Sequence, residues 1–427
     1  MSYIGSTPTT QSFTSGTDYF NGTGSQTAFT LSRTVNSIND IEVVVNNVEQ
    51  QPNTSYTISG TTLTFTAAPS SGTQNIYVRY LSTITTALAP SQNTVQYSSL
   101  NSDNQSKLGI QYKNRIINGA MVINQRGFSG TPANGDYTLD RWFALITQSS
   151  KFTVSQNAGS VTPPVGFTNY LGCTSSSAYS VGASDYFIMY QYIEGFNTAD
   201  LGWGTASAKT VTLSFQVYSS LTGTFGGSIL NNNNNRSYPF TYTVSSANTW
   251  TPISITIAGD TTGTWETTTS TGIKVGFGLG AGSTVSGTAG TWSGTLYRSA
   301  TGATSVVGTS GATFYITGVQ LEVGTQATQF TTAGGSYGAE LALCQRYYLS
   351  GKQDVSISGI SGRYVRQLLI TANLRTTPTT TYSYDGSSGA VTAIESNLVN
   401  SLISIWCRSD VGTYIDGNVT YTASAEL

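Results

Sequence analysis

Two short stretches of the chain have the spacing of catalytic or cofactor-binding motifs. Residues 334–338, GGSYG, match the G-x-S-x-G pattern that exposes a nucleophilic serine. Such a serine needs a base, usually histidine, and the 427-residue chain has no histidine. The same absence removes the commonest ligand of zinc. Residues 276–280, GFGLG, lack the full dinucleotide fingerprint and are typical of a glycine-rich strand. No catalytic residue, metal site or cofactor is therefore predicted.

Glycoside hydrolysis is the enzymatic alternative, because it needs two carboxylates about 5 to 10 Å apart and no histidine. The chain has only 20 acidic residues, and some have other expected roles. Asp140 beside Arg141 indicates a local salt bridge, and Asp260 in AGDTTG indicates a turn. No window concentrates acids and aromatic residues, so a non-enzymatic function is predicted, with a polysaccharide depolymerase as an alternative.

The tryptophans could take part in sugar binding, since flat aromatic rings stack on the C–H faces of neutral sugars. Trp203 and Trp292 lie between glycines, where exposure is easy, and are candidate sugar contacts. Trp142 and Trp406 lie in apolar runs and are expected in the core. The asparagine tract at 231–235 is expected to be a solvated loop.

The composition excludes several kinds of partner. Charged residues make up 9% of the chain, against roughly 25% in ordinary globular domains. A net charge of −2 without a Lys/Arg cluster argues against a nucleic-acid partner. The chain has no run of about 18 apolar residues and no signal-peptide pattern. We therefore expect a soluble protein, synthesised in the cytoplasm and without membrane insertion.

The elements that must position these residues are strands. Hydrophobic residues make up 38% of the chain, with 26 Tyr and 16 Phe, and abundant Ser, Thr and Gly favour β-structure over disorder. The widely spaced Cys173, Cys344 and Cys407 are expected to be buried thiols and not disulfides. The predicted fold is mainly β and multi-domain, because 427 residues exceed what one core supports.

Two segments are predicted at the N-terminal side. Residues 1–82 form a small antiparallel β-domain, with an alternating run at 41–45, a turn at Asn46 and Asn47, and another at Ser59 and Gly60. Residues 83–113 lose the apolar pattern and contain no heptad repeat, so they are predicted to be a linker or collar.

Residues 114–333 are predicted to form a jelly-roll sandwich. In FYITGVQLEV, Phe314 and Ile316 face one side, Gly318 is one residue too many, and Val319 and Leu321 return to the same side. This pattern indicates a β-bulge. Bulged strands separated by long polar loops suit a curved sandwich.

Residues 334–427 are predicted to form a short helix followed by a C-terminal β-sandwich tip. Tyr337, Leu341, Cys344 and Tyr348 follow at spacings of four, three and four, as on one side of a helix. Six residues of this terminal domain flank predicted turns and offer stacking or hydrogen bonding to a ligand: Arg363, Tyr384, Asp385, Arg408, Tyr414 and Asp416.

Several stretches together resemble tail-fibre and receptor-binding proteins of tailed bacteriophages. In the N-terminal part these are FNGTGSQTAFTLS, IEVVVNNVEQ and YTISGTTLTFTAAPSSGTQNIYVRYL. Further along the chain they include NRIINGAMVINQRG, YTLDRW, QYIEGFNTADLGWGTASAKTVTLSF, ITGVQLEVGTQATQF and ELALCQRYY. Together the stretches span nearly the whole chain.

The resemblance implies a homotrimeric virion appendage. Residues 1–82 would attach to the phage tail or an adaptor protein, the jelly roll would be carbohydrate-binding-like, and the distal domains would bind a host surface glycan. The helix stripe would pack around the threefold axis. No long fibrous shaft follows from this sequence, so a short appendage is expected. A purely structural virion component, such as a collar, head fibre or adaptor, is the other alternative.

Overall fold

The computed structural model describes residues 16–81, 113–357, 364–371, 374–385, 402–408 and 415–427. The chain forms two compact units, residues 1–101 and 102–427. Each consists mainly of antiparallel strands, which confirms the predicted mainly β class. The predicted division into four segments stays a prediction.

The first unit packs a four-stranded sheet, β1-β6-β3-β4, against the β2-β5 pair. Asn46 and Asn47 have φ of 49° and 63°, and they form the predicted two-residue turn between β3 and β4. The turn expected at Ser59 and Gly60 is wrong, because β5 runs through both residues. The elements are β1 (Thr17–Gly22), β2 (Ala28–Val35), η1 (Ile38–Asp40), β3 (Ile41–Val45), β4 (Val48–Glu49), β5 (Tyr56–Phe65) and β6 (Gly72–Tyr80).

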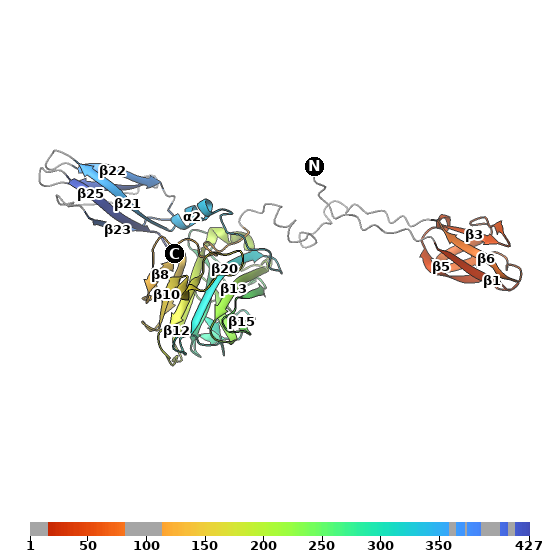
Figure 1. Ribbon diagram of the computed structural model, residues 1–427, viewed down its shortest axis with the longest axis horizontal. Coiled ribbons are helices and arrows are strands. Elements are labelled where there is room, and N and C mark those ends of the chain that lie inside the picture. The colour runs from red at the N-terminus through yellow and green to blue at the C-terminus, as the bar shows by residue number, and fades with distance from the viewer. Residues whose placement is uncertain (1–15, 82–112, 358–363, 372–373, 386–401, 409–414) are drawn as a thin grey trace. The chain divides into compact units, whose positions relative to one another are not determined.

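The larger part of the second unit is a sandwich of two six-stranded sheets (Figure 1). One sheet, which we name the front sheet, has the order β16-β13-β20-β11-β10-β7. The other, which we name the back sheet, has the order β15-β14-β17-β12-β9-β8. The front-sheet strands are β7 (Ser129–Gly130), β10 (Phe152–Gln156), β11 (Leu171–Ser175), β13 (Val211–Ser219), β16 (Thr251–Ile257) and β20 (Thr313–Val323). The back-sheet strands are β8 (Tyr137–Leu139), β9 (Trp142–Ile146), β12 (Tyr186–Glu194), β14 (Gly223–Asn231), β15 (Ser237–Val244) and β17 (Thr271–Ala281). Shorter elements are η3 (Ala158–Ser160), η4 (Gly195–Asn197), η5 (Ala199–Leu201), β18 (Ser286–Gly287) and β19 (Ser299–Ala300).

The core lies between the two sheets. Alternate residues of each strand point inward, so that Phe215 of the front sheet meets Phe277 of the back sheet at a ring separation of 5.0 Å. Trp142 is fully buried, as predicted, and packs on Phe277. Cys173 is a buried free thiol, also as predicted.

The predicted bulge in β20 is confirmed. Ser214 of β13 pairs with Gln320, but Gln216 pairs with Thr317, so β20 has one extra residue. Gly318 takes φ of +63° at this point, a conformation that glycine adopts without steric cost.

The C-terminal part of the second unit contains the sheet β21-β25-β23 and the pair β22-β24. Ser336, the serine of the GGSYG stretch, is the N-cap of helix α2, where its Oγ accepts a hydrogen bond from the Ala339 amide. The elements are α2 (Tyr337–Gln345), β21 (Tyr348–Ile357), β22 (Tyr364–Thr371), β23 (Thr379–Tyr384), β24 (Leu402–Arg408) and β25 (Ile415–Ser424).

The predicted helix stripe needs a correction. The helix ends at Gln345, so Tyr348 belongs to β21. Cys344 is fully buried against Ile117 and other residues of the same chain, with Leu341 partly buried beside it, whereas Tyr337 is exposed. The buried side of the helix is therefore already covered within one chain.

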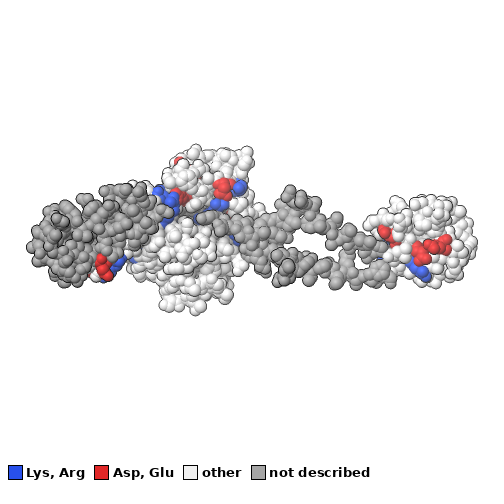
Figure 2. All heavy atoms as spheres, turned by 90° about the horizontal axis from the view of Figure 1, so that it is seen from above, with Lys and Arg blue, Asp and Glu red and all other residues white. Residues whose placement is uncertain are grey.

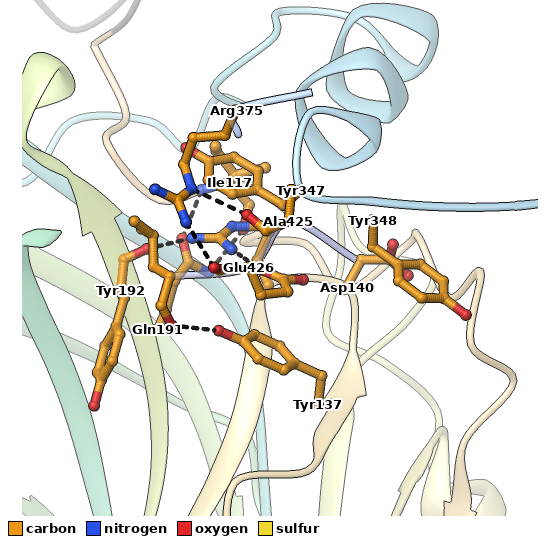
Figure 3. A network of polar contacts seen from close by, with 12 residues as sticks. Ile117, Tyr137, Asp140, Gln191, Tyr192, Tyr347, Tyr348, Arg375, Ala425 and Glu426 are labelled. Carbon is orange, nitrogen blue, oxygen red and sulfur yellow. Dashed lines mark hydrogen bonds and ion pairs between the residues drawn. The ribbon is translucent and has the colours of Figure 1, made fainter. Parts of the chain in front are cut away.

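The C-terminal residues bind the sandwich through a polar network (Figure 3). The Glu426 carboxylate lies between Arg141, with which it forms a short contact, and Arg126, at 2.8 Å. Arg375 donates to the carbonyl oxygens of Ala425 and Glu426 at 3.0 and 2.7 Å. The expected Asp140–Arg141 salt bridge is wrong, because Arg141 pairs with a residue 285 positions away.

Candidate functional site

A groove of about 420 Å³ lies on the outer face of the front sheet. Strands β13 and β16 contribute Ser214, Gln216 and Ser254 to its lining. Phe167 and Phe330 also line the groove, with ring centroids 5.1 Å apart. The groove therefore combines flat aromatic rings with hydroxyl and amide groups.

The strand alternation places these polar groups outward. Leu213, Phe215 and Val217 fill the core, so Ser214 and Gln216 between them face away from it. Ser254 lies directly opposite Ser214 on the neighbouring strand. Across the described residues, the side chains of Ser214, Gln216 and Ser254 have no hydrogen-bond partner. Their donors and acceptors are available to a ligand.

The β-bulge makes room for one aromatic wall. A Cβ atom on Gly318 would lie 2.5 Å from Cζ of Phe167, so the glycine permits this close approach. Buried polar side chains of β20 hold the segment that carries Phe330, whose ring packs on that of Phe167. Glu322 accepts hydrogen bonds from the Thr328 amide and hydroxyl at 2.8 and 2.7 Å, and Gln320 accepts one from the Thr331 amide at 2.9 Å. These bonds fix the segment that carries Phe330.

Further aromatic side chains continue along the same outer face. Tyr218 follows Gln216 at strand spacing and stacks on Tyr315, with ring centroids 5.3 Å apart and planes inclined by 7°. Trp250 contacts Tyr218 at 5.5 Å and remains partly exposed. None of these three residues was predicted from the sequence to bind a ligand. Their signal was the alternation of Ser214, Gln216 and Tyr218 opposite the core positions.

Among the described residues, none that lines the groove is charged. Figure 2 shows that the described surface facing the viewer is largely free of charged side chains. An uncharged groove with aromatic walls and free hydroxyl and amide groups is suited to a neutral, hydroxyl-rich ligand.

The structure brings the candidate sugar contacts Trp203 and Trp292 together, but away from the groove. Their ring centroids are 5.3 Å apart, and Trp265 packs edge-on against both. The indole N–H groups of Trp203 and Trp292 each donate to a backbone carbonyl at 2.8 Å. Trp203 is only 7% exposed, so its ring mainly packs within the protein.

Of the six candidate tip residues, only one has a side chain among those that the structure describes. Arg363 and Tyr414 lie outside the described residues. Tyr384, Arg408 and Asp416 lie in β23, β24 and β25, but the description does not extend to their side chains. It does not extend to those of Trp406 and Cys407 either.

Asp385 is the one candidate tip residue whose side chain is described. It is exposed and accepts hydrogen bonds from Lys352 Nζ at 3.1 Å and from the Asn418 amide at 2.8 Å. The hydrogen bond from Lys352 lowers the pKa of its carboxyl group. Its role in receptor binding stays a prediction.

Two other expectations concern polar loops. Asp260 accepts a hydrogen bond from the Thr262 amide, as expected of a turn residue, and also pairs with Arg236 at 2.6 Å. The asparagine tract at 231–235 is not simply solvated. Asn231 is buried, and its side-chain oxygen accepts hydrogen bonds from the amides of Asn235 and Arg236 at 3.1 Å.

Across the described residues, the structure has no helix long and apolar enough to cross a membrane. The same residues contain no group of three or more His, Cys, Asp or Glu side chains placed to hold a metal ion.

Comparison with known proteins shows weak similarity to solved structures. No protein-family model and no curated protein matches the chain. The enzymatically active domain of tailspike protein 4 from bacteriophage CBA120 shares 14% identity over 50% of this chain and 22% of its own, with a TM-score of 0.29. TmCBM61 in complex with β-1,4-galactotriose shares 10% identity over 50% of this chain and 99% of its own, with a TM-score of 0.25.

A family 11 carbohydrate-binding module from Clostridium thermocellum, in complex with a β-1,3-1,4-mixed-linked tetrasaccharide, is also similar. It shares 12% identity over 47% of this chain and 98% of its own, with a TM-score of 0.24. All these TM-scores are below 0.5, so the similarities carry no argument about function. The fold and the groove themselves define a multi-domain β-sandwich protein with an uncharged surface groove.

Proposed function

We propose that the protein is a tail-fibre component of a tailed-bacteriophage virion that binds a host surface polysaccharide without cleaving it. The observation that carries the binding part is the groove, in which Phe167 and Phe330 stand beside the unpaired side chains of Ser214, Gln216 and Ser254. The resemblance of the sequence stretches to phage fibre proteins supports the virion part. In this proposal residues 1–82 attach to the tail or an adaptor, and the tip adds receptor contacts.

The proposal accounts for the modest size of the groove. One small site that forms few hydrogen bonds binds a glycan weakly. A homotrimer on a particle with several fibres would present many such sites, and linked sites can raise avidity by ~10²-fold or more. Weak individual contacts would also let the particle sample the cell surface before it attaches.

A double variant, Gln216→Ala with Phe330→Ala, tests the groove. We expect it to bind purified host polysaccharide about thirtyfold more weakly, because a hydrogen bond and a stacking ring each contribute about 1 kcal/mol. The measurement is calorimetric titration of the full chain with the polysaccharide. Thr243→Ala, an exposed change on β15 of the back sheet, is the matched control. Unchanged affinity of the double variant would exclude the groove as the binding site.

The alternatives are separated by two further measurements on the same full chain. A purely structural virion component should not label host cells when it carries a fluorophore. A depolymerase should release reducing sugar ends from the polysaccharide, whereas a binding protein should leave its chain length unchanged.

A further inference from the structure

The outer face of the back sheet carries two basic side chains that face no acid among the residues that the structure describes. Lys274 of β17 is 6% exposed, and its Nζ donates to the Asn232 carbonyl and to Asn234 Oδ1, both at 2.9 Å. Arg298 is partly buried, with its guanidinium 4.4 Å from the ring centroid of Tyr186. Within the described part of the chain, neither side chain forms a salt bridge.

Six other buried or partly buried cations of the second unit differ in this respect, although Lys151 and Arg375, within the described residues, do not. Each of the following pairs joins such a cation to a carboxylate: Lys113–Glu322, Arg115–Asp200, Arg126–Glu426, Arg141–Glu426, Arg236–Asp260 and Arg346–Glu194. A buried cation is usually paired with a carboxylate, because removing a charge from water costs free energy that an opposite charge offsets. Lys274 and Arg298 lack this compensation within the described chain.

The two cations also act on each other. Burial, together with the neighbouring positive charge of Arg298, lowers the pKa of Lys274 from 10.5 to about 8. Lys274 therefore still carries most of its charge at pH 7. An anion placed between the two side chains would reduce both the desolvation cost and the mutual repulsion.

Two buried polar atoms beside the cations also lack well-formed hydrogen bonds. The Tyr190 hydroxyl and the Arg298 Nε are both buried without a hydrogen bond of ordinary geometry in the described structure, and the nearby Arg298 guanidinium partly offsets the rise that burial causes in the pKa of Tyr190. Tyr190 is fully buried and lies across Gly276, where a Cβ atom would be 2.4 Å from its ring. Orphaned donors are rare in protein interiors. Here both belong to the same face as the unpaired cations.

The surrounding surface is partly open. Tyr186 and Tyr192 are partly exposed, and Lys274 lies opposite Tyr192 in the strand register with its Nζ 5.1 Å from the ring centroid. An approaching ligand would thus meet tyrosine rings next to positive charge.

We infer that Lys274 and Arg298, with Tyr186, Tyr190 and Tyr192, form a binding site for the acidic group of a glycan, a carboxylate or sulfate. The site lies on the opposite sheet from the groove and uses charge where the groove uses neutral groups. Only the choice of a glycan as the carrier of the anion rests on the proposed function.

Lys274→Met tests this site. The variant removes the charge and keeps most of the side-chain volume, so the fold should be retained. We expect its affinity for trigalacturonate to fall at least tenfold relative to the unaltered chain at pH 7, with unchanged binding of neutral polysaccharide in the groove. Lys151→Met is the matched control, because Lys151 also lies over a tyrosine ring, that of Tyr179, at 4.5 Å. Calorimetric titration of the full chain provides the affinities.

Titration with inorganic sulfate tests whether the site binds an anion that is not attached to a glycan. The site as stated would be supported if sulfate and trigalacturonate both bind the unaltered chain and neither binds Lys274→Met. Sulfate binding without trigalacturonate binding would overturn the glycan carrier, and binding of neither would overturn the site. If the groove variant loses neutral polysaccharide while Lys274→Met loses only the acid, the two sites are independent. Loss of the acidic ligand alone would therefore not count against the groove.

The pH dependence gives a second test. Raising the pH from 7 to 9 neutralises Lys274, so affinity for trigalacturonate should fall. The titratable and charged groups facing Lys274 are Arg298, Tyr186, Tyr190 and Tyr192, and burial raises the pKa of Tyr190 and Tyr192. In the protein without ligand, the effect of Lys274 on folding stability changes with pH in the opposite direction to ligand affinity. Between pH 8 and 10.5 the unfolded chain binds a proton that the folded chain has lost, so the Lys274 contribution to stability rises with pH.

The difference in melting temperature between the unaltered chain and Lys274→Met should therefore change in favour of the unaltered chain over this range. Taking the difference removes the contributions of tyrosines that titrate in both proteins. A difference that stays constant with pH would show that Lys274 is not a buried, uncompensated cation.

Discussion

Replacing Glu426 by alanine is expected to destabilise the second unit by about 3–5 kcal/mol, the usual cost of removing one partner of a buried ion pair. The Arg141 side chain is 1% exposed, and an arginine cannot lose its proton at ordinary pH. Without the Glu426 carboxylate its charge would stay buried with only neutral partners, such as the Tyr192 carbonyl and the Tyr347 ring. Arg126 would lose the same partner. Urea unfolding of the full chain, followed by tryptophan fluorescence, measures the change.

Asp385→Asn is the matched control for this experiment. It also removes the acid of a salt bridge, with Lys352, but both side chains there are 55% exposed. Water and salt screen such a pair, so the unfolding midpoint of the second unit should not change. Equal effects of the two substitutions would show that Arg141 is not buried in solution as it is in this structure.

Replacing Gly318 by valine should affect both stability and ligand binding. The residue has φ of +63°, which costs a β-branched residue about 1–3 kcal/mol. The new side chain would also meet the Phe167 ring, which lies 2.5 Å from the position of a Cβ atom. We expect the free energy of unfolding to decrease by at least that amount and polysaccharide affinity to fall with the displaced ring.

Gly338→Ala provides a control of opposite sign. This glycine lies in the first turn of α2, has no positive φ, and has nothing within 4 Å of a Cβ atom. Alanine there should stabilise the protein by about 0.5–1 kcal/mol through its helix propensity. If Gly318→Val left both stability and polysaccharide affinity unchanged, neither the bulge nor the wall formed by Phe167 would be needed.

Local features of this chain were predictable from the sequence. The alternation around Gly318 indicated both the bulge and the core side of β20, because the side-chain period of a strand is two and an extra residue shifts it. The Asn46-Asn47 turn followed from the tolerance of asparagine for positive φ. The burial of Trp142 followed from its apolar neighbours. Each of these depends on residues within a few positions of one another.

The prediction of Trp203 and Trp292 as sugar contacts shows where local reasoning stops. Flanking glycines suggest exposure, but three strand-connecting segments bring Trp203, Trp265 and Trp292 together. The indole N–H groups of Trp203 and Trp292 donate hydrogen bonds to backbone carbonyls. No spacing in the sequence predicts that these three tryptophan side chains contact one another. The groove was missed for the same reason, since Phe167, Gln216 and Phe330 come from three distant segments.

By itself, then, the sequence determined the β class, the bulge, the short helix and the uncharged character of the surface, because composition and periodicity act locally. Only the tertiary structure decided which side chains meet. Arg141 pairs with Glu426, far along the chain, and not with its neighbour Asp140. Among the described residues, Lys274 and Arg298 have no acidic partner. Pairing of buried charges is fixed by strand register and loop paths, which bring distant residues into one low-dielectric environment.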